Sequence, residues 1–171
     1  MSKSVKHLAI INVNDEYGTP PFLFLEACKK FNCTPTVDYF ASHANHVCDK
    51  YYTKEDKVFE MDWTSNGFLN PPYSKIKKVM KKAYEEHLKN NIELLILTYN
   101  KTDTKWWHSY VEGKAEVHFH NVRISFNDRF GKRTQNKAPY GSAWIIYRSK
   151  PTIKAQVQTM FPNWKKYGKL R

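Results

Sequence analysis

The chain has 171 residues, 41% of them hydrophobic and 15% aromatic, which suits one globular domain with a real core and excludes wholesale disorder. This length leaves no room for a second full domain devoted to selecting a DNA sequence. The 28 lysines and arginines exceed the 16 acidic residues by 12, so the chain attracts polyanions. Nucleic acid is the polyanion that we expect, and a charge that only maintains solubility is the alternative.

The cysteines and the apolar segments set further bounds. Cys28, Cys33 and Cys48 are odd in number, and their spacings match no paired CxxC zinc pattern, so we expect reduced thiols and no bound metal. The apolar stretch at 8–13 is far shorter than the roughly 20 residues of a membrane helix, and no signal or transit peptide is visible. We therefore expect a cytoplasmic protein with no membrane partner.

The first predicted helix and strand frame a long polar loop. Thr19 can cap a helix, the prolines after it suit a first helical turn, and the helical spacing ends near residues 31–32. Residues 36–41 have the β-branched and aromatic content of a strand. The polar stretch 42–53 that follows is long enough to wrap a ligand at the carboxyl end of this strand.

The middle of the chain continues the alternation of strands and helices. Short apolar pieces at 58–61 and 67–69 are predicted as strands or strand edges. Ser74 can cap a long basic helix over 75–89, whose apolar residues repeat at helical spacing. The continuous apolar run 93–98 is typical of a strand that is buried on both faces of an α/β sheet.

The second half predicts a short helix and then an antiparallel ending. The helix covers 103–111, and three β-like segments follow it at 115–120, 122–126 and 142–147. Strand–helix alternation followed by antiparallel strands indicates a three-layer α/β domain with a mixed sheet. We assign this single domain to residues 1–150 and expect a short helix and basic tail over 151–171.

The motif Asn70-Pro71-Pro72-Tyr73 lies where an apolar strand meets a helix, the place where open α/β sheets bind ligands. Methylation of an aromatic amine requires acceptors for both N–H groups, because the lone pair of the nitrogen is delocalised into the ring. The Asn70 side-chain oxygen and the Pro71 carbonyl can be these acceptors, and the prolines stiffen the turn. Tyr73 can stack on a base that has swung out of the duplex. This chemistry needs no metal and no covalent intermediate, and a bare proline turn is the alternative.

Further motifs accompany this turn in a characteristic order: Tyr17-Gly18-Thr19-Pro20, Val37-Asp38-Tyr39-Phe40-Ala41-Ser42, Asp62-Trp63, Trp106-Trp107, Arg123-Ile124-Ser125-Phe126 and Ala138-Pro139-Tyr140-Gly141-Ser142. With them the chain resembles the small phage-type DNA N6-adenine methyltransferases (Dam-like) over residues 17–147. The resemblance implies a Rossmann-like class I methyltransferase fold with a mixed, mostly parallel sheet. It also implies S-adenosylmethionine as the cofactor, double-stranded DNA as the partner, and methyl transfer to the exocyclic amine of a flipped adenine.

The resemblance further implies which residues contact the cofactor. Those implied at its methionine end are Tyr17, Thr19 and Pro20. Those implied in the loop after the first strand are Asp38, Phe40 and Ala41. Asp62 is implied to bind the adenine amine of the cofactor, and the ribose hydroxyls are left to Asp38 or Asp49. The sequence departs from the wider pattern in having no Gly-rich loop after Asp38.

The segment 127–140 between two predicted strands is expected to contact DNA. Its candidate contacts are Arg129, Lys132, Arg133 and Lys137, because such loops place cations against phosphates and reach base edges. Phe126, by analogy with a late aromatic in related enzymes, is the candidate second wall against the flipped base. The tail cations Lys165, Lys166, Lys169 and Arg171 would add a nonspecific electrostatic grip.

Two residue pairs have a simpler interpretation. Trp106 and Trp107 point about 100° apart on a helix, so at least one packs in the core while the other can face the substrate. His118 and His120 share one face of a predicted strand, but a metal site needs further ligands, so a polar strand face is the better interpretation.

Alternative functions stay open. One is a DNA-binding relic that kept the fold and lost catalysis, which the missing glycines favour and the intact motif opposes. Methylation of RNA adenine or of protein glutamine would use the same tetrapeptide, although glutamine gives no reason for the charge of +12. Cytosine N4 methylation is less favoured, because that chemistry more often places serine where Asn70 stands.

Overall fold

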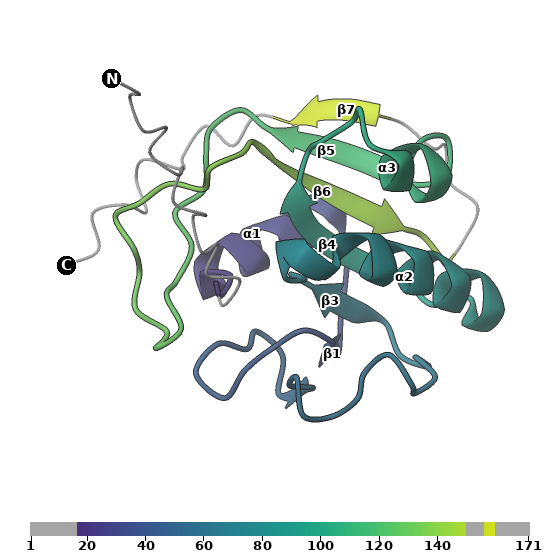
Figure 1. The fold of residues 1–171 in the computed structure, drawn as a ribbon, viewed down its shortest axis with the longest axis horizontal. Helices are drawn as coiled ribbons and strands as arrows, with labels where there is room; N and C mark the ends of the chain where they lie inside the picture. The colour runs from purple at the N-terminus through teal and green to yellow at the C-terminus, as the bar shows by residue number, and fades with distance from the viewer. Residues whose placement is uncertain (1–16, 150–155, 160–171) are drawn as a thin grey trace, which may run out of the picture.

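The computed structural model describes residues 17–149 and, for the backbone alone, residues 156–159 (Figure 1). They build one seven-stranded sheet in the order β2-β1-β3-β4-β6-β5-β7. The strands are β1 (Val37–Asp38), β2 (Lys50–Tyr51), β3 (Gly67–Leu69), β4 (Leu94–Tyr99), β5 (Glu116–His120), β6 (Ser142–Tyr147) and β7 (Gln156–Thr159). The apolar stretch 8–13 and the cations Lys165, Lys166, Lys169 and Arg171 lie outside the described residues.

All strands but one run in the same direction. β1 pairs in parallel with β2 and β3, and β3 pairs in parallel with β4. β6 is antiparallel to both of its neighbours, β4 and β5, whereas β7 is parallel to β5. The prediction of a mixed, mostly parallel sheet is therefore confirmed. The carboxyl ends of β1, β3, β4 and β5 consequently share one edge of the sheet.

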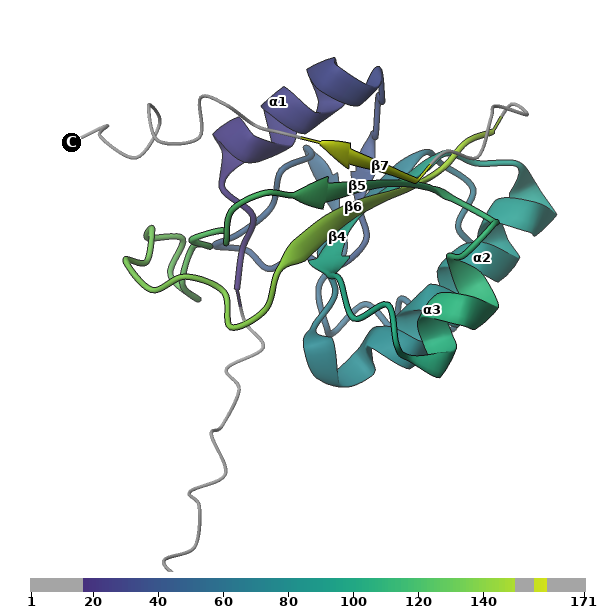
Figure 2. The same ribbon diagram turned by 90° about the horizontal axis from the view of Figure 1, so that it is seen from above.

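Helices cover both faces of the sheet and complete the three predicted layers (Figure 2). α1 (Pro21–Phe31) lies on one face, and α2 (Ile76–Asn90) and α3 (Lys105–Tyr110) lie on the other. A 3₁₀ turn, η1 (Tyr73–Lys75), leads from the end of β3 into α2. The sheet thus separates two apolar cores.

β4 shows why its sequence is apolar throughout. Leu95 and Leu97 belong to the core under α1, while Leu94 and Ile96 belong to the core under α2 and α3. All six residues of the strand are buried. Side chains alternate between the faces of a strand, so a strand covered on both faces has no position for a solvent-facing residue.

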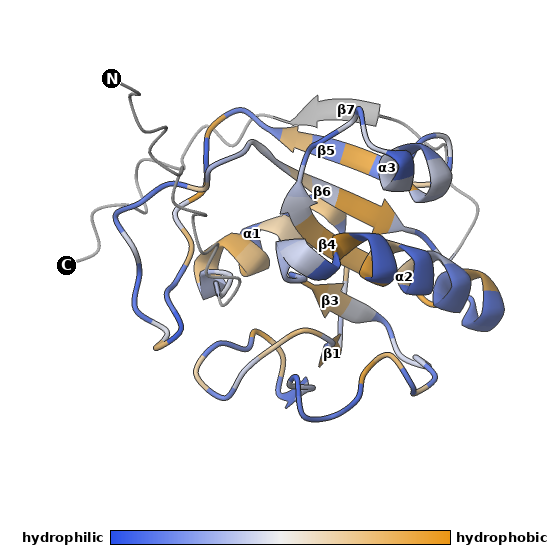
Figure 3. Cartoon of the chain, in the orientation of Figure 1, coloured by the Kyte–Doolittle hydropathy of each residue, from blue (hydrophilic) through white to orange (hydrophobic). Residues whose placement is uncertain are grey.

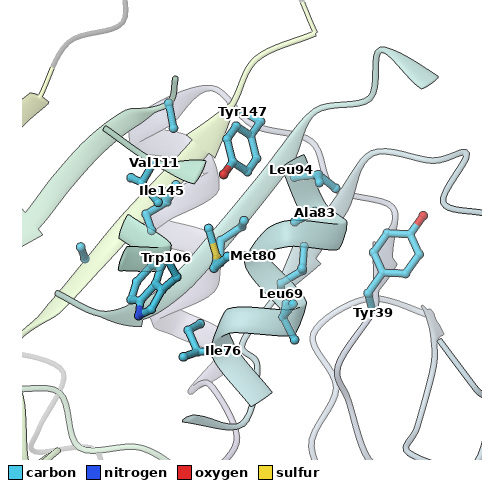
Figure 4. Close-up of a cluster of buried hydrophobic side chains, with 14 of the residues drawn as sticks. Tyr39, Leu69, Ile76, Met80, Ala83, Leu94, Trp106, Val111, Ile145 and Tyr147 are labelled. Atoms are coloured by element: carbon cyan, nitrogen blue, oxygen red, sulfur yellow. The ribbon is translucent and has the colours of Figure 1, made fainter. Parts of the chain in front are cut away.

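α2 packs on the sheet through a stripe at helical spacing. Its Ile76, Met80 and Ala83 point at the sheet, where Leu94 and Tyr147 meet them (Figure 4). The opposite face of the helix is strongly hydrophilic (Figure 3). This division matches the predicted basic amphipathic helix.

Arg148 is the centre of a hydrogen-bonded cluster at the sheet edge opposite the carboxyl ends of the parallel strands. Its guanidinium donates to Glu116 at 2.9 and 3.2 Å, to Glu93 at 3.1 Å, and to the carbonyl of Phe31 at 2.8 Å. The same group lies 3.2 Å from Cys33 Sγ. Burial chiefly, with the charge of Glu93, raises the pKa of Cys33 to about 12, so this thiol is protonated and inert. The cluster joins the end of α1 to strands β4, β5 and β6.

Two predicted strands are wrong. Residues 58–61 form turns, because β1 and β3 pair directly with each other and leave no place between them. Lys57 enters these turns with φ 49°, and the indole of Trp63 donates to the Val58 carbonyl at 3.0 Å.

Residues 122–126 pair inside their own loop instead of joining the sheet. The Ile124 carbonyl accepts from Ala138 N at 2.7 Å, and the Phe126 carbonyl accepts from Thr134 N at 3.0 Å. The segment thus folds back on 134–138, which satisfies its main chain without a sheet neighbour.

The predicted helix caps also differ from the structure. Pro20, and not Thr19, occupies the N-cap of α1, and its carbonyl accepts from the first turn. Lys75, and not Ser74, occupies the N-cap of α2, because η1 precedes that helix. A proline in the first turn of α1 is confirmed.

Both adjacent tryptophans are core residues. Trp106 is 6% exposed and Trp107 is 2% exposed, so the prediction that at least one packs in the core is confirmed, and neither is open to a substrate. Residues 156–159, which we expected within a helix and tail, form β7 at the edge of the sheet. The rest of 151–171 lies outside the described residues.

Candidate active site

A cavity of about 530 Å³ opens where β1, β2 and β3 end. Its walls come from four segments and a few single residues: 17–19, 38–47, 53–55, 57–59, Phe68, Asn70, Pro72, Lys75 and Arg129. Open α/β sheets bind ligands at this edge, and the volume lies in the range of small-molecule sites.

Asn70 follows β3 directly and is held in one orientation. Its amide nitrogen Nδ2 donates to the main-chain carbonyl of Tyr17 at 2.9 Å. This bond commits the donor end of the amide to the protein. The end left to face a ligand is the acceptor, Oδ1.

The rest of the motif forms a stiff turn behind Asn70. Pro71 is buried and Pro72 lines the cavity, and the Pro72 carbonyl accepts from Lys75 N at 3.0 Å. The ring of Tyr73 stands edge-to-face against Tyr99 with 4.6 Å between centroids. Tyr73 and Pro71 are not among the residues that line the cavity, so Tyr73 lies beside it, braced by a second aromatic ring.

Asp38 organises the loop that the sequence predicted to wrap a ligand. The carboxylate is 3% exposed and accepts from Phe40 N at 3.3 Å and from Val47 N at 3.2 Å. It therefore clasps both ends of the loop that contains Ala41. Burial raises the pKa of Asp38 to about 7, and the two backbone hydrogen bonds oppose the shift. The loop after β1 is thus shaped by the Asp38 carboxylate and not by a Gly-rich segment.

The N-terminal segment contributes one unsatisfied hydroxyl. Thr19 is 6% exposed and lines the cavity, and no partner within the described residues meets its Oγ1. Tyr17 also lines the cavity and is 41% exposed. Pro20, the N-cap of α1, is not among the residues that line the cavity.

Asp62 is not brought to the cavity. Its side chain is 63% exposed and pairs with Lys89 Nζ at 2.7 Å, and that bond lowers its pKa. The neighbouring Trp63 is fully buried beneath Val58, which turns Asp62 outward to the end of α2. The structure therefore gives no support to Asp62 as a cofactor contact.

Glu55 is an acidic residue that lines the cavity and that sequence reasoning missed. It belongs to a turn in which Thr53 N and Oγ1 both donate to Asp56 Oδ2, at 2.7 and 2.9 Å. A hydrogen bond with Thr53 lowers the pKa of Glu55, so the carboxyl is ionised at neutral pH. The Thr-x-x-Asp spacing at 53–56 is the signal that could have revealed this turn.

These walls suit S-adenosylmethionine. The buried hydroxyl of Thr19 is a polar group in need of a partner, and Glu55 offers a carboxylate to an amine or hydroxyl. Between them Phe40, Val58 and Phe59 provide an apolar surface for a purine. A small set of polar groups on an apolar lining is the usual composition of a cofactor site.

The four predicted basic contacts are all exposed on the loop between β5 and β6, which is mostly hydrophilic in Figure 3. Arg129 alone among them lines the cavity. The guanidinium of Arg133 lies 5.2 Å from the ring centre of Phe22, and Lys132 and Lys137 face solvent.

Phe126 is 5% exposed and packs in the core under α1, with its ring 6.5 Å from that of Tyr17. It therefore lies behind Tyr17 and does not line the cavity.

Within the described residues no helix has the length and apolarity to cross a membrane. No three His, Cys, Asp or Glu side chains of that part of the chain gather as metal ligands would. His120 accepts from the indole of Trp144 at 2.7 Å and is 7% exposed, and burial lowers its pKa to about 4.

An Asn-Pro-Pro-Tyr turn at the carboxyl end of a parallel strand, beside a cofactor-sized cavity, defines the class as an α/β methyltransferase of Rossmann-like fold. Residues 8–165 match the family described as DNA N-6-adenine-methyltransferase (Dam), and the chain belongs to this family.

Two phage proteins illustrate the relationship. A DNA N-6-adenine-methyltransferase of Haemophilus phage HP1 (strain HP1c1) is 30% identical over 150 residues, which are 79% of this chain and 87% of that protein. A DNA N-6-adenine-methyltransferase of Escherichia phage T1 is 36% identical over 84 residues, which are 47% of this chain and 34% of that protein. The resemblance predicted from the motifs is thereby confirmed at the level of the family.

Proposed function

We propose that this protein transfers a methyl group from S-adenosylmethionine to the N6 amine of an adenine that has been flipped out of duplex DNA. The observation that carries the proposal is the orientation of Asn70, whose donor is bound by Tyr17 and whose acceptor is left for a ligand. An exocyclic amine offers two N–H donors, so an acceptor held in place matches it. Family membership supports DNA adenine as the substrate.

In this proposal the cavity holds the cofactor by its two ends. The Thr19 hydroxyl and the Tyr17 segment meet the methionine end, while Phe40, Val58 and Phe59 cover the purine and Glu55 meets a polar group. The cofactor supplies an activated methyl group on a sulfonium sulfur. Asp38 acts by holding the loop 39–47 in shape, and Ala41 forms part of that loop.

The target amine is prepared by two acceptors. Asn70 Oδ1 and the Pro71 carbonyl accept its N–H groups, which draws the nitrogen toward tetrahedral geometry and frees the lone pair for the methyl group. The nitrogen would bond to the methyl carbon as the methyl–sulfur bond breaks and leaves a neutral thioether, and one N–H proton would then pass from the nitrogen to solvent water. Pro71 and Pro72 fix the backbone before the substrate arrives, so little reorganisation accompanies the reaction. Tyr73, braced by Tyr99, presents a face for the base.

The exposed cations Arg129, Lys132, Arg133 and Lys137 bind the phosphates around the target. Phe126 acts in this proposal by backing the ring of Tyr17, which is the exposed member of that pair. Residues 1–150 with β7 form the catalytic unit, and the cations of the last residues add affinity without sequence preference.

The test is methyl transfer from labelled S-adenosylmethionine to unmodified plasmid DNA, with nucleosides identified by mass spectrometry. We expect N6-methyladenine from the wild type, none above background from Asn70→Ala, and a wild-type level from Asn121→Ala, an exposed asparagine outside the cavity. Label that enters RNA or a protein but not DNA would overturn the substrate. No transfer together with no heat of cofactor binding in calorimetry would favour the DNA-binding relic.

A further inference from the structure

The loop between β5 and β6 contains a turn, Asn127–Arg133, that is held by hydrogen bonds among its own residues. Asp128 Oδ1 accepts from Phe130 N and from Lys132 N, both at 2.9 Å. Asp128 N donates to the Lys132 carbonyl at 2.7 Å, and Gly131 N donates to the Asp128 carbonyl at 3.0 Å. Gly131 has φ +78°, which a side chain would disfavour. Phe130 therefore stands at the apex of a turn with a defined shape.

The turn is fastened to the rim of the cavity. The side chain of Asn45 donates to the Asp128 carbonyl at 2.7 Å. Gly18 and Asn127 exchange two main-chain hydrogen bonds of 3.0 and 2.8 Å. A Cβ on Gly131 would come within 2.7 Å of the Ala44 carbonyl, so the two backbones are in close contact. The turn is thus positioned by the same loop and N-terminal segment that line the cavity.

Phe130 is an apolar ring on a turn that also carries three cations. It is 65% exposed, the highest value among the exposed large hydrophobic side chains of the described residues. The Arg129 guanidinium lies 4.6 Å from its ring centre, and Lys132 and Arg133 are exposed on the same turn. The one carboxylate of the turn, Asp128, already accepts two backbone N–H groups.

This combination fits a nucleic-acid duplex better than an apolar protein surface. Cations on the turn would lose solvation against an apolar partner, whereas phosphates pair with them while the ring reaches the stacked bases. Arg129 lines the cavity that contains Asn70, so the next residue, Phe130, lies beside the rim of that cavity.

We propose that Phe130 inserts into the base stack of duplex DNA and occupies the gap left by the extruded adenine. The inference rests on the proposed function, because it requires that a base leave the duplex. Extrusion costs stacking and pairing, and an aromatic side chain in the vacated position restores part of the stacking. Phe130 thereby acts on the flipping equilibrium and not on the chemistry at Asn70.

The test uses a duplex with a site first mapped on plasmid DNA methylated by the wild type. In one form the target adenine is paired with thymine, and in the other it faces an abasic position, where extrusion is already easy. For Phe130→Ala we expect kcat/KM on the paired duplex to fall on the order of tenfold, the scale of one base–aromatic stacking contact. On the abasic duplex the variant should equal the wild type.

Two controls separate insertion from other roles. Phe130→Trp keeps a stacking ring and should retain activity on the paired duplex, while Leu88→Ala removes a 61% exposed apolar side chain on α2 and should change neither reaction. With 2-aminopurine at the target position, the fluorescence gain on binding should be smaller for Phe130→Ala than for the wild type.

An equal loss on both duplexes, or no loss on the paired one, would overturn the insertion and leave the proposed function intact. A wild type that methylates no DNA would overturn the proposed function itself.

Discussion

The contact between Asn70 and Tyr17 makes a sharp prediction for Asn70→Asp. A carboxylate keeps, and even strengthens, the acceptor that the target amine requires. It cannot donate to the Tyr17 carbonyl, which lies 2.9 Å from the present amide nitrogen. Two oxygens would then face each other, so the carboxylate turns away or the N-terminal segment moves.

The size of the effect follows from that one hydrogen bond. Loss of this solvent-exposed hydrogen bond costs about 0.5–1.5 kcal/mol, which corresponds to roughly 2- to 13-fold in kcat/KM. Protonation gives the introduced carboxyl an O–H that can donate to Tyr17 again. The carbonyl raises the pKa of this carboxyl, so the activity of the variant relative to wild type should increase as the pH falls.

The assay is single-turnover methyl transfer to DNA between pH 8 and pH 6, with cofactor affinity measured in parallel by calorimetry. Cofactor affinity should fall where the Tyr17 segment moves and stay unchanged where only the carboxylate turns away, because that segment lines the cavity. If Asn70→Asp matched the wild type at pH 8, the Tyr17 carbonyl would not orient this side chain, and the argument for the site would fail.

Three further predictions concern the frame of the site. Arg148→Met leaves Glu93 without its cation and Glu116 with His118 alone at the far edge of the sheet, so the free energy of unfolding in urea should fall by about 3 kcal/mol while methyl transfer per folded molecule is unchanged. Gly18→Ala places a Cβ 2.0 Å from Asn45 Oδ1 and 2.6 Å from Asn45 Cβ, and should weaken cofactor binding about tenfold in calorimetry; the double variant with Asn45→Gly, which removes both atoms, should recover most of it, and additive losses would argue against the clash. The pKa of Asp38 is raised to about 7, so an ionised Asp38 is disfavoured in the fold and stability should fall as pH rises from about 4 to about 7, by as much as about 4 kcal/mol. Asp38→Asn should lack this fall, and parallel pH curves for the two proteins would contradict it.

The sequence predicted those parts of the fold that periodicity determines. β4 is apolar throughout because both faces are covered, and the stripe of Ile76, Met80 and Ala83 reflects one packed face of a helix. The position of Asn70 at the end of a strand followed from the motif itself. These features depend on neighbours along the chain, which a sequence displays.

What the sequence did not predict depends on distant contacts. Asp62 turns outward because Trp63 beside it is buried, and no local pattern reveals which of two neighbours faces the core. Glu55 reaches the cavity through a turn closed by Asp56. Phe130 lies in a segment that the sequence marked as basic, but its exposure at an apex depends on how the turn folds.

The reversal of β6 has a consequence for how this enzyme family can diversify. Because β5 runs with the parallel strands and β6 returns against it, the connection between them must emerge at the edge of the sheet where the cavity opens. A parallel successor would have required a crossover that begins at this edge and ends at the other. The pairing of the two strands is fixed from Glu116↔Ile146 to Phe119↔Ala143, independently of what the connection contains. The connection can therefore be lengthened or exchanged without shifting the sheet, so members of the family can differ in this segment while the frame around the cavity stays the same.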